Sequence, residues 1–400
     1  MNFFKRMTAL ALAGVISLSL LVGCQQQGGS SSSASAPDEV PEVVDVNAID
    51  DICVYLTGLK GDETVATVDG TKITAGELMY WITANCDNLL NYYYYYGVTE
   101  LPWDSTDESG ETTLADFVLE DAVNYAALQR LLEQKGKEAG LTVSQENKDA
   151  IQSAMDAMEA NFAADGVTLE QYLWQQGLTG ELYRWNCECD YMYEALAEAT
   201  FGEGSGNEPT QEDILAYREE MGEYKVKHIL LASIDTSTRE ALDEETVAEK
   251  KAAADTLLAA LRKSEDPMTL FDEYMNTLSE DPGLATNPEG YVFTANTTVD
   301  PAFEEAALAL EPGQISDVVE GASGYHIILR LPLEVDVEQD KDEYINAQMA
   351  ELADGWIGQA EIKTTKAFDG LNAQVIYEKM TVYRNAITEM ATPAQEETAE

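Results

Sequence analysis

The stretch that decides the fold is residues 300–331, DPAFEEAALALEPGQISDVVEGASGYHIILRL. An apolar helix that begins at a proline comes first, Pro312-Gly313 then marks a turn, and QISDVVE and GYHIILRL are two predicted strands. The second strand contains His326, one of only two histidines in the 400 residues. A titratable ring in an otherwise apolar strand raises the question of what it faces.

The second histidine, His228, lies in the predicted strand YKVKHILLAS, residues 224–233, which opens the same region. Between the two strands the sequence predicts a helix at 243–263, a shorter helix MTLFDEYMNTLS, a turn-rich loop around Asp281-Pro282-Gly283 and a strand at 291–293. This order describes a compact α+β domain on an antiparallel sheet. First and last strands of such a sheet can be neighbours, with cross-strand Cβ atoms about 5 Å apart, so we expect the two imidazoles to meet.

The segments VKHILL, LSEDPG and 300–331 together resemble the parvulin peptidyl-prolyl isomerases. The resemblance implies a parvulin-like domain at 224–333 with a four-stranded antiparallel sheet and surrounding helices, and it implies neither a metal nor a cofactor. It also implies that His228, Asp281 and His326 are the catalytic residues. The residues it places at the substrate's proline ring and in the histidine network are Tyr291, Phe293, Val299, Phe303 and Ser323.

Three positions differ from the parvulin pattern. Val299 stands where the family usually has a methionine, and Gly290 stands where a leucine lines the pocket, with Tyr291 as its substitute. Gly321 stands where a threonine is common before Ser323. These differences predict a reshaped ring pocket on an unchanged fold. The loop SIDTSTREALDEE lacks a cluster of basic residues, which argues against a preference for phosphorylated substrates.

Prolyl isomerisation requires little chemistry from a protein. Rotation about the prolyl amide faces a barrier of about 20 kcal/mol that comes from amide resonance. An apolar pocket that desolvates the amide, and a group that interacts differently with the twisted carbonyl, should favour the twisted state. We expect Phe303, Val299 and Tyr291 to hold the ring, Asp281 to provide the field at the carbonyl, and the histidines to fix a hydrogen-bond network beneath.

The N-terminus predicts export. Lys5 and Arg6 precede an apolar run from Met7 to Val22, the layout of a secretory signal. The run ends in Leu21-Val22-Gly23-Cys24, which resembles the lipobox of bacterial lipoproteins. We therefore expect residues 1–23 to be a signal peptide, Cys24 to be lipidated, and 24–49 to be a flexible tether on the outer face of the bacterial cell membrane.

Helical patterns dominate on both sides of the mixed domain, over 50–215 and 334–391, and the tail 392–400 is predicted to be disordered. Neither flank obviously makes a core alone, so we expect the two to pack together around an inserted middle domain. The lipobox, the segment VATVDGTKIT and these flanks resemble the secreted foldase lipoproteins of the PrsA type and, more distantly, the SurA chaperones. Such a foldase could form a homodimer through its helical flanks.

The charge restricts the partners. The chain has 23 basic and 74 acidic residues, a net charge of −51, which excludes nucleic acid as a partner because the phosphate backbone would be repelled. Unfolded or partly folded secreted polypeptides with X-Pro bonds are the expected substrates. Four cysteines besides Cys24 allow two disulfides in three pairings.

Two interpretations remain open from the sequence. The stretch NYYYYYGVTELPW, with tyrosines 92–96, is either an aromatic surface that binds substrates or a helix end whose tyrosines pack on neighbours. The whole protein is either a membrane-anchored isomerase that assists folding or a chaperone whose parvulin-like domain is weakly active or inactive.

Overall fold

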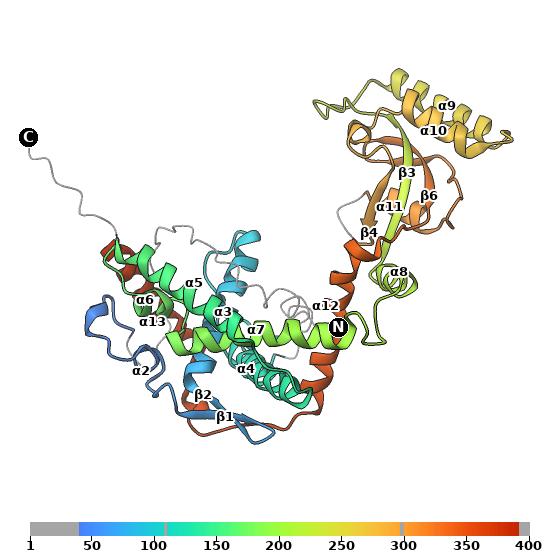
Figure 1. Cartoon of the computed structure of the whole chain (residues 1–400). Coiled ribbons are helices and arrows are strands. Elements are labelled where there is room, and N and C mark those ends of the chain that lie inside the picture. The colour runs from blue at the N-terminus through green and yellow to red at the C-terminus, as the bar shows by residue number, and fades with distance from the viewer. Residues whose placement is uncertain (1–39, 108–109, 297–299, 392–400) are drawn as a thin grey trace, which may run out of the picture. The chain divides into compact units, whose positions relative to one another are not determined.

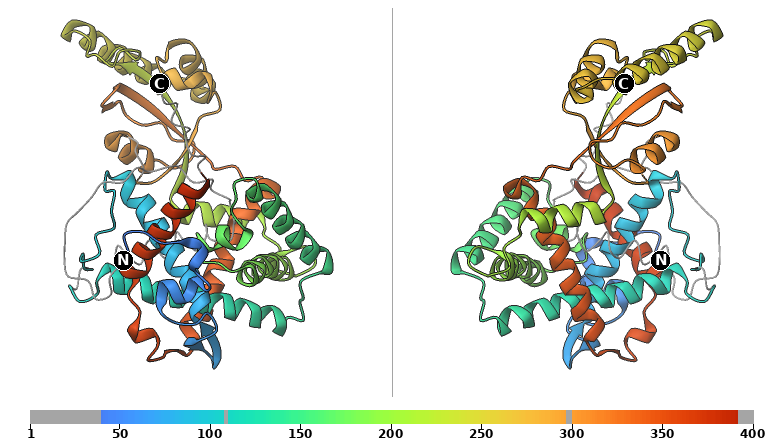
Figure 2. Two further views of the ribbon diagram at one scale, coloured as in Figure 1. Left: turned by 90° about the vertical axis from the view of Figure 1, so that its left-hand side faces the viewer. Right: turned by 90° about the vertical axis from the view of Figure 1, so that its right-hand side faces the viewer.

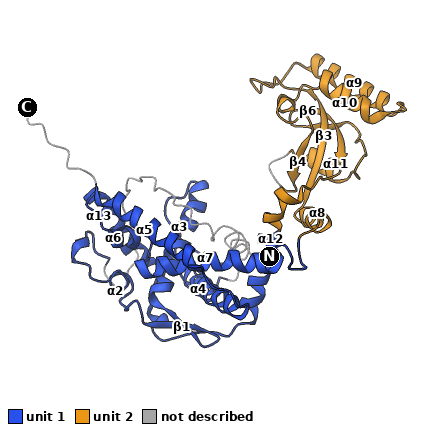
Figure 3. Ribbon diagram, viewed as in Figure 1, with its two compact units in different colours: residues 1–208, 345–400 blue, residues 209–344 orange. Residues whose placement is uncertain are grey.

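The structure, a computed structural model, describes residues 40–107, 110–296 and 300–391. Figure 3 divides the chain into two compact units. One unit ends at Glu208 and resumes at Ile345, and the other consists of Pro209–Tyr344. The predicted arrangement, a mixed domain inserted into a helical domain built from both ends of the chain, is confirmed. Residues 209–215 and 334–344, assigned to the flanks from sequence, group with the inserted unit.

The first unit is mostly helical. Three of its helices begin with a complete capping box, in which a threonine and an acidic or amide side chain bond each other's backbone N–H. Thr168 and Gln171 form one of these boxes. Its main helices are α2 (Ile52–Thr57), α3 (Ala75–Tyr95), α4 (Leu114–Glu138), α5 (Gln145–Ala163), α6 (Leu169–Trp174), α7 (Gly180–Phe201) and α13 (Ala373–Ala391) (Figure 1). Helix α12 (Val337–Gln359) enters this unit from the other.

One hydrophobic core joins the two ends of the chain in this unit. Met380 and Tyr383 of α13 are fully buried in the same cluster as Leu78 and Ile82 of α3. The N-terminal and C-terminal segments therefore fold as one body.

A clamp of polar contacts reinforces this junction. Arg384 on α13 bonds both carboxylate oxygens of Asp87 on α3, at 2.8 and 2.7 Å. The hydroxyl of Tyr377 donates to the same carboxylate at 2.7 Å, and Nε of Arg384 donates to the carbonyl of Gln175 at 2.7 Å. A bidentate pair of this kind fixes orientation as well as distance.

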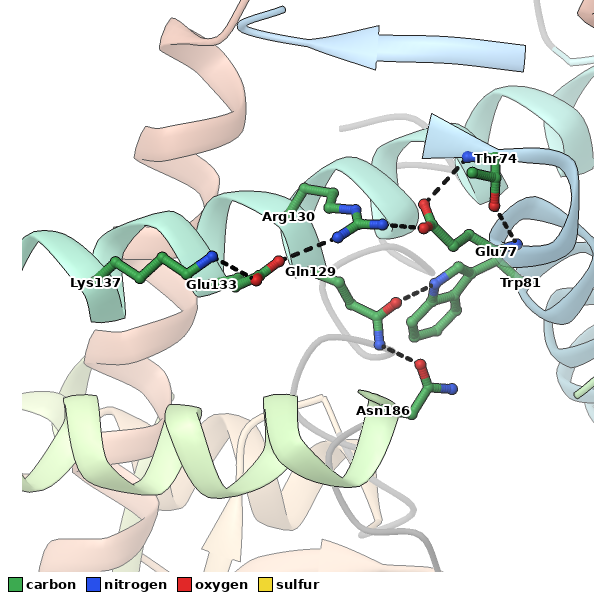
Figure 4. Close-up of polar contacts among 8 residues, drawn as sticks. All are labelled: Thr74, Glu77, Trp81, Gln129, Arg130, Glu133, Lys137 and Asn186. Carbon is green, nitrogen blue, oxygen red and sulfur yellow. Dashed lines mark hydrogen bonds and ion pairs between the residues drawn. The ribbon is translucent and has the colours of Figure 1, made fainter. Parts of the chain in front are cut away.

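A second polar network joins α3, α4 and α7 (Figure 4). Glu77 is only 4% exposed and pairs with Arg130 of α4. Trp81 donates to Gln129 at 2.9 Å, and Gln129 donates to Asn186 of α7 at 3.2 Å. These contacts satisfy polar groups between helices and thereby fix the register in which the helices pack.

A small sheet also belongs to this unit, in the order β2–β1–β7. Strands β1 (Thr64–Val68) and β2 (Thr71–Thr74) pair antiparallel around the Asp69-Gly70 turn. Strand β7 (Ile362–Thr364) pairs antiparallel with β1, whereas the sequence predicted only helix over 334–391. That prediction was wrong because three residues are too few to show an alternating pattern, and the partner strand is distant in sequence.

The second unit has the predicted four-stranded antiparallel sheet, in the order β4–β3–β6–β5. Its strands are β3 (Glu223–Ala232), β4 (Tyr291–Thr294), β5 (Val319–Gly321) and β6 (Gly324–Leu331), and its helices are α8 (Gln211–Glu220), α9 (Glu244–Leu261), α10 (Pro267–Leu278) and α11 (Pro301–Leu308). The predicted strand QISDVVE is shorter than expected. Ser316 explains this, because its Oγ accepts the N–H of Ile328 at 2.9 Å where a backbone carbonyl would otherwise serve.

The two faces of this sheet have different roles (Figure 2). Ile229 and Ile327 face α9 and α10 in one apolar cluster. Val226 and Ile328 face α11 in a second cluster, which also contains Phe303. Because side chains alternate along a strand, His228 and His326 lie on this second face.

Four cysteines fall within the described residues, and all four are free thiols. Cys53, Cys86 and Cys189 are buried, and burial raises the pKa of Cys53 to about 11. None of the disulfide pairings left open by the sequence is formed. In the described ranges, no helix is long and apolar enough to cross a bilayer.

We expect Arg384→Ala to lower the free energy of unfolding of the first unit by about 1–3 kcal/mol, because Asp87 and the carbonyl of Gln175 lose a charged donor. All five tryptophans belong to this unit, so urea unfolding followed by tryptophan fluorescence measures it separately. The control is Lys148→Ala, which removes an exposed pair with Glu188 at 3.8 Å and should change the free energy by less than about 0.5 kcal/mol. Equal effects of the two variants would show that the clamp contributes nothing.

Candidate active site

The two histidines meet across the central strand pair. His326 is opposite Leu230 and His228 is opposite Ile328, so the rings are diagonal neighbours on one face. Their Nδ1 atoms are 3.2 Å apart, and His326 is only 6% exposed. A neutral imidazole has one N–H, so one Nδ1 donates and the other accepts. The prediction that these rings converge is confirmed.

A short loop brings Asp281 to this pair. The loop follows α10 and is bonded to β3 beyond the point where β4 ends. Oγ of Ser279 accepts the N–H of Leu230 at 3.1 Å, and Oε2 of Glu280 accepts the N–H of Ala232 at 2.8 Å. The N–H of Glu280 in turn donates to the carbonyl of Leu230 at 2.8 Å. The next residue is therefore held beside His228.

Asp281 is held by three donors. Nε2 of His228 is 3.2 Å from Oδ2, the hydroxyl of Tyr291 donates to Oδ2 at 2.5 Å, and the N–H of Gly283 donates to Oδ1 at 3.0 Å. Burial raises the pKa of this carboxyl, but the three hydrogen bonds lower it more, to about 2. Asp281 is therefore ionised at neutral pH and accepts from Nε2 of His228.

The protonation of the pair follows from this bond. When His228 is neutral and its proton is on Nε2, its Nδ1 has no hydrogen and accepts from Nδ1 of His326. Burial first, and then the neighbouring His228, lower the pKa of His326 to about 4, although Asp300 and Asp281 oppose the shift. His326 is thus neutral at physiological pH.

Aromatic side chains surround the histidines. The ring of Phe303 on α11 is edge-on to both imidazoles, with centroid distances of 5.3 Å to His228 and 5.2 Å to His326. Tyr291 and Phe293 of β4 are stacked, with centroids 5.6 Å apart and planes at 7°. The predicted ring-binding residues Tyr291, Phe293 and Phe303 therefore lie on the face that carries the histidines.

Two glycines are required around Tyr291, one for the strand beside it and one for its hydroxyl. Gly290 has φ +96°, and a Cβ there would lie 2.5 Å from the carbonyl oxygen of Val226. A Cβ at Gly283 would lie 2.4 Å from the Tyr291 hydroxyl. Position 290, where the parvulin pattern has a leucine, is a glycine in this chain, and the next residue, Tyr291, bonds the carboxylate of Asp281.

One predicted residue, Ser323, is not brought into this cluster. Ser323 lies in the turn between β5 and β6, where its carbonyl accepts the N–H of Ser233 at 3.0 Å; its hydroxyl bonds neither imidazole. Its expected place in the histidine network is therefore not observed. Val299 and Cys24 lie outside the described residues.

A second carboxylate, that of Asp300, was not predicted from the sequence. It caps α11 and bonds the turn before His326. The signal was its Asp-Pro dipeptide, a helix-start pattern that also appears at Asp266-Pro267. Across residues 40–107, 110–296 and 300–391, no group of three or more His, Cys, Asp or Glu side chains is arranged to hold a metal ion.

Comparisons with known proteins agree with this geometry. Residues 228–331 match the family model described as rotamase, a PPIC-type PPIase domain. The foldase protein PrsA of Caldanaerobacter subterraneus subsp. tengcongensis is 27% identical over 276 residues, which cover 66% of this chain and 72% of that protein. The chaperone SurA of Yersinia pestis (strain Antiqua) is 30% identical over 160 residues, which cover 38% of this chain and 34% of that protein.

The crystal structure of PrsA from Bacillus subtilis aligns with 85% of this chain and 96% of that one, at 17% identity and a TM-score of 0.23. The domain is identified by the matched family model and by the histidines, the carboxylate and the aromatic residues described above. Residues 228–331 are a PPIC-type, or parvulin-type, peptidyl-prolyl isomerase domain, and the chain that contains them is similar to the PrsA and SurA proteins.

Proposed function

We propose that this protein isomerises X-Pro bonds in unfolded or partly folded secreted polypeptides on the outer side of the membrane. The observation that carries the proposal is the chain of hydrogen bonds from Asp281 through His228 to His326, with aromatic rings beside it. Similarity to the PrsA and SurA proteins, named foldase and chaperone, supports polypeptides as substrates.

The site favours the twisted amide through its surroundings. A proline ring seated against Phe303 and Tyr291 leaves the preceding carbonyl near the ionised Asp281. The planar amide is stabilised by a partial negative charge on its oxygen, and the twisted amide has less of it. A fixed carboxylate beside that oxygen therefore destabilises the planar form relative to the twisted one, and each gain of about 1.4 kcal/mol is tenfold in rate.

The histidines have a supporting role in this scheme. Nε2 of His228 faces Asp281 and keeps the carboxylate oriented, and Nδ1 of the same ring bonds His326. Mechanisms that use a nucleophile are not needed, because no bond is broken during isomerisation.

The location outside the cell rests on the sequence. A lipidated Cys24 would anchor the protein in the membrane. The segment 25–49, which is rich in Gln, Gly and Ser, would act as a flexible linker between the anchor and the folded domains. The net charge of −51 would keep that body away from anionic lipid surfaces while leaving basic or weakly charged polypeptides free to approach.

A chaperone activity is a second candidate, and one observation favours it. Tyr94, Tyr95 and Tyr96, at the end of α3, are 57%, 85% and 64% exposed. Tyr96 contacts Tyr92 and Tyr95, with ring centroids 5.1 and 5.3 Å apart, so both interpretations of this stretch stay open. Tyrosine offers a large contact area at a low cost in side-chain entropy, which suits a surface that holds unfolded chains.

Asp281→Ala in the full-length protein should lower kcat/KM for a proline-containing peptide by about 10- to 100-fold, because the fixed charge at the carbonyl is lost. The activity is measured by a coupled protease assay. Asp243→Ala is the matched control, since it removes an exposed aspartate that caps α9 in the same unit, and it should retain wild-type activity. Activity that survives unchanged in Asp281→Ala would contradict the assigned role.

Cys24→Ser should move the protein from the membrane pellet to the soluble fraction of exporting cells, because the acylated thiol is lost. Fractionation and metabolic labelling with a fatty acid measure this. Incorporation of label that does not depend on Cys24 would rule out the proposed anchor.

Replacing Tyr94, Tyr95 and Tyr96 by serine should weaken the suppression of aggregation of a reduced, unfolded substrate several-fold, without lowering peptide isomerisation, since the tyrosines and the isomerase site belong to different units. Light scattering measures the first property. The control replaces three exposed apolar residues of the other unit, Met221, Leu278 and Leu308, by serine. If both triple variants suppress aggregation equally well, the tyrosines are not the contact surface.

A further inference from the structure

A second carboxylate lies near the histidine pair, and no role has been given to it so far. Asp300 caps α11: its Oδ1 accepts the N–H groups of Ala302 at 3.0 Å and Phe303 at 3.3 Å. Its Oδ2 accepts the N–H of Ala322, in the turn between β5 and β6, at 2.6 Å. One side chain therefore bonds the helix that carries Phe303 to the turn that precedes His326.

The carboxylate of Asp300 lies where a neighbouring side chain is missing. A Cβ built on Gly321 would lie 3.3 Å from Cγ and from both carboxylate oxygens of Asp300. The parvulin pattern has a threonine at this position. Val319 is paired with His326, and residues two apart on a strand face the same way, so a side chain at 321 would face the histidine side of the sheet.

We infer that Asp300 is a positioning residue that takes the place of the absent threonine. It fixes Phe303 edge-on to the two imidazoles, and it holds the turn that precedes His326. This inference rests on the isomerase function proposed above.

The electrostatics of the site agree with this role. The charged and titratable groups acting on His326 come from three elements: His228 on β3, Asp281 in the loop after α10, and Asp300 at the start of α11. Asp300 favours the protonated form of His326, and His326 in turn contributes to lowering the pKa of Asp300, after the larger effect of the bond from Ala322. Two carboxylates, Asp281 and Asp300, thus act on His326.

The chain provides a matched control for the capping function itself. Asp266 caps α10, is followed by Pro267 as Asp300 is followed by Pro301, and accepts the N–H of Thr269 at 3.2 Å. Asp266→Ala removes an equivalent helix cap in the same unit without touching the histidine face.

The test compares Asp300→Ala, Asp266→Ala and the double variant Asp300→Ala with Gly321→Thr, all in the full-length protein. The backbone of Gly321 is not in the left-handed region, so threonine can be accommodated once the carboxylate is removed. We expect both single variants to lower Tm by a similar few degrees. We expect only Asp300→Ala to lower kcat/KM, by about tenfold, and the added threonine to recover most of that loss.

A second measurement does not depend on activity. The chain has only two histidines, so the ¹⁵N signals of their imidazoles at pH 7 are assigned by comparison with His228→Gln. Asp300→Ala should shift the His326 signals, the double variant should return them toward those of the wild type, and Asp266→Ala should leave them unchanged.

The inference is overturned if Asp300→Ala affects activity and the His326 signals no more than Asp266→Ala does, or if threonine at 321 restores neither. A wild-type protein without isomerase activity would refute the proposed function instead. In that case the His326 signals alone decide whether Asp300 positions the pair.

Discussion

The pairing of β3 with β6 is the constraint on which the site depends. Its register sets His228 two residues away from the partner of His326, and this offset lets the two Nδ1 atoms approach to 3.2 Å. A slip of one residue would turn one imidazole to the opposite face, into the apolar cluster under α9 and α10. The apolar residues that alternate with the histidines therefore hold the register that the chemistry requires.

Much of the inserted domain could be predicted from its sequence because its signals are local or alternate along strands. The order of elements predicted the sheet, and the expectation that its first and last strands are neighbours predicted that the two histidines meet. Strand β7 was missed since three residues carry no periodic signal, and its pairing with β1 joins distant parts of the chain. The role of Asp300 was not predicted, for a different reason. Asp300 lies in the space that is open because Gly321 has no side chain, and the sequence alone does not show which residue fills that space.

The helical unit shows a related limit. Its helix starts were predictable because a capping box needs only two side chains three residues apart. The contacts between helices were not, since Asp87 and Arg384, like Trp81, Gln129 and Asn186, are selected by three-dimensional packing. The exposure of Tyr94–Tyr96 likewise could not be predicted from composition, because a run of tyrosines is compatible with a helix end that packs on neighbours and with one that is exposed to solvent.

The loop that contains Asp281 also covers part of the edge of β3, to which an extended chain could otherwise bind. Ser279 and Glu280 occupy the hydrogen-bonding groups of Leu230 and Ala232 along the edge of β3 that β4 leaves uncovered. An open edge would offer a template on which an extended substrate could add as an extra strand and start to aggregate. The segment that contains Asp281 thus also blocks the addition of an extended strand at this edge.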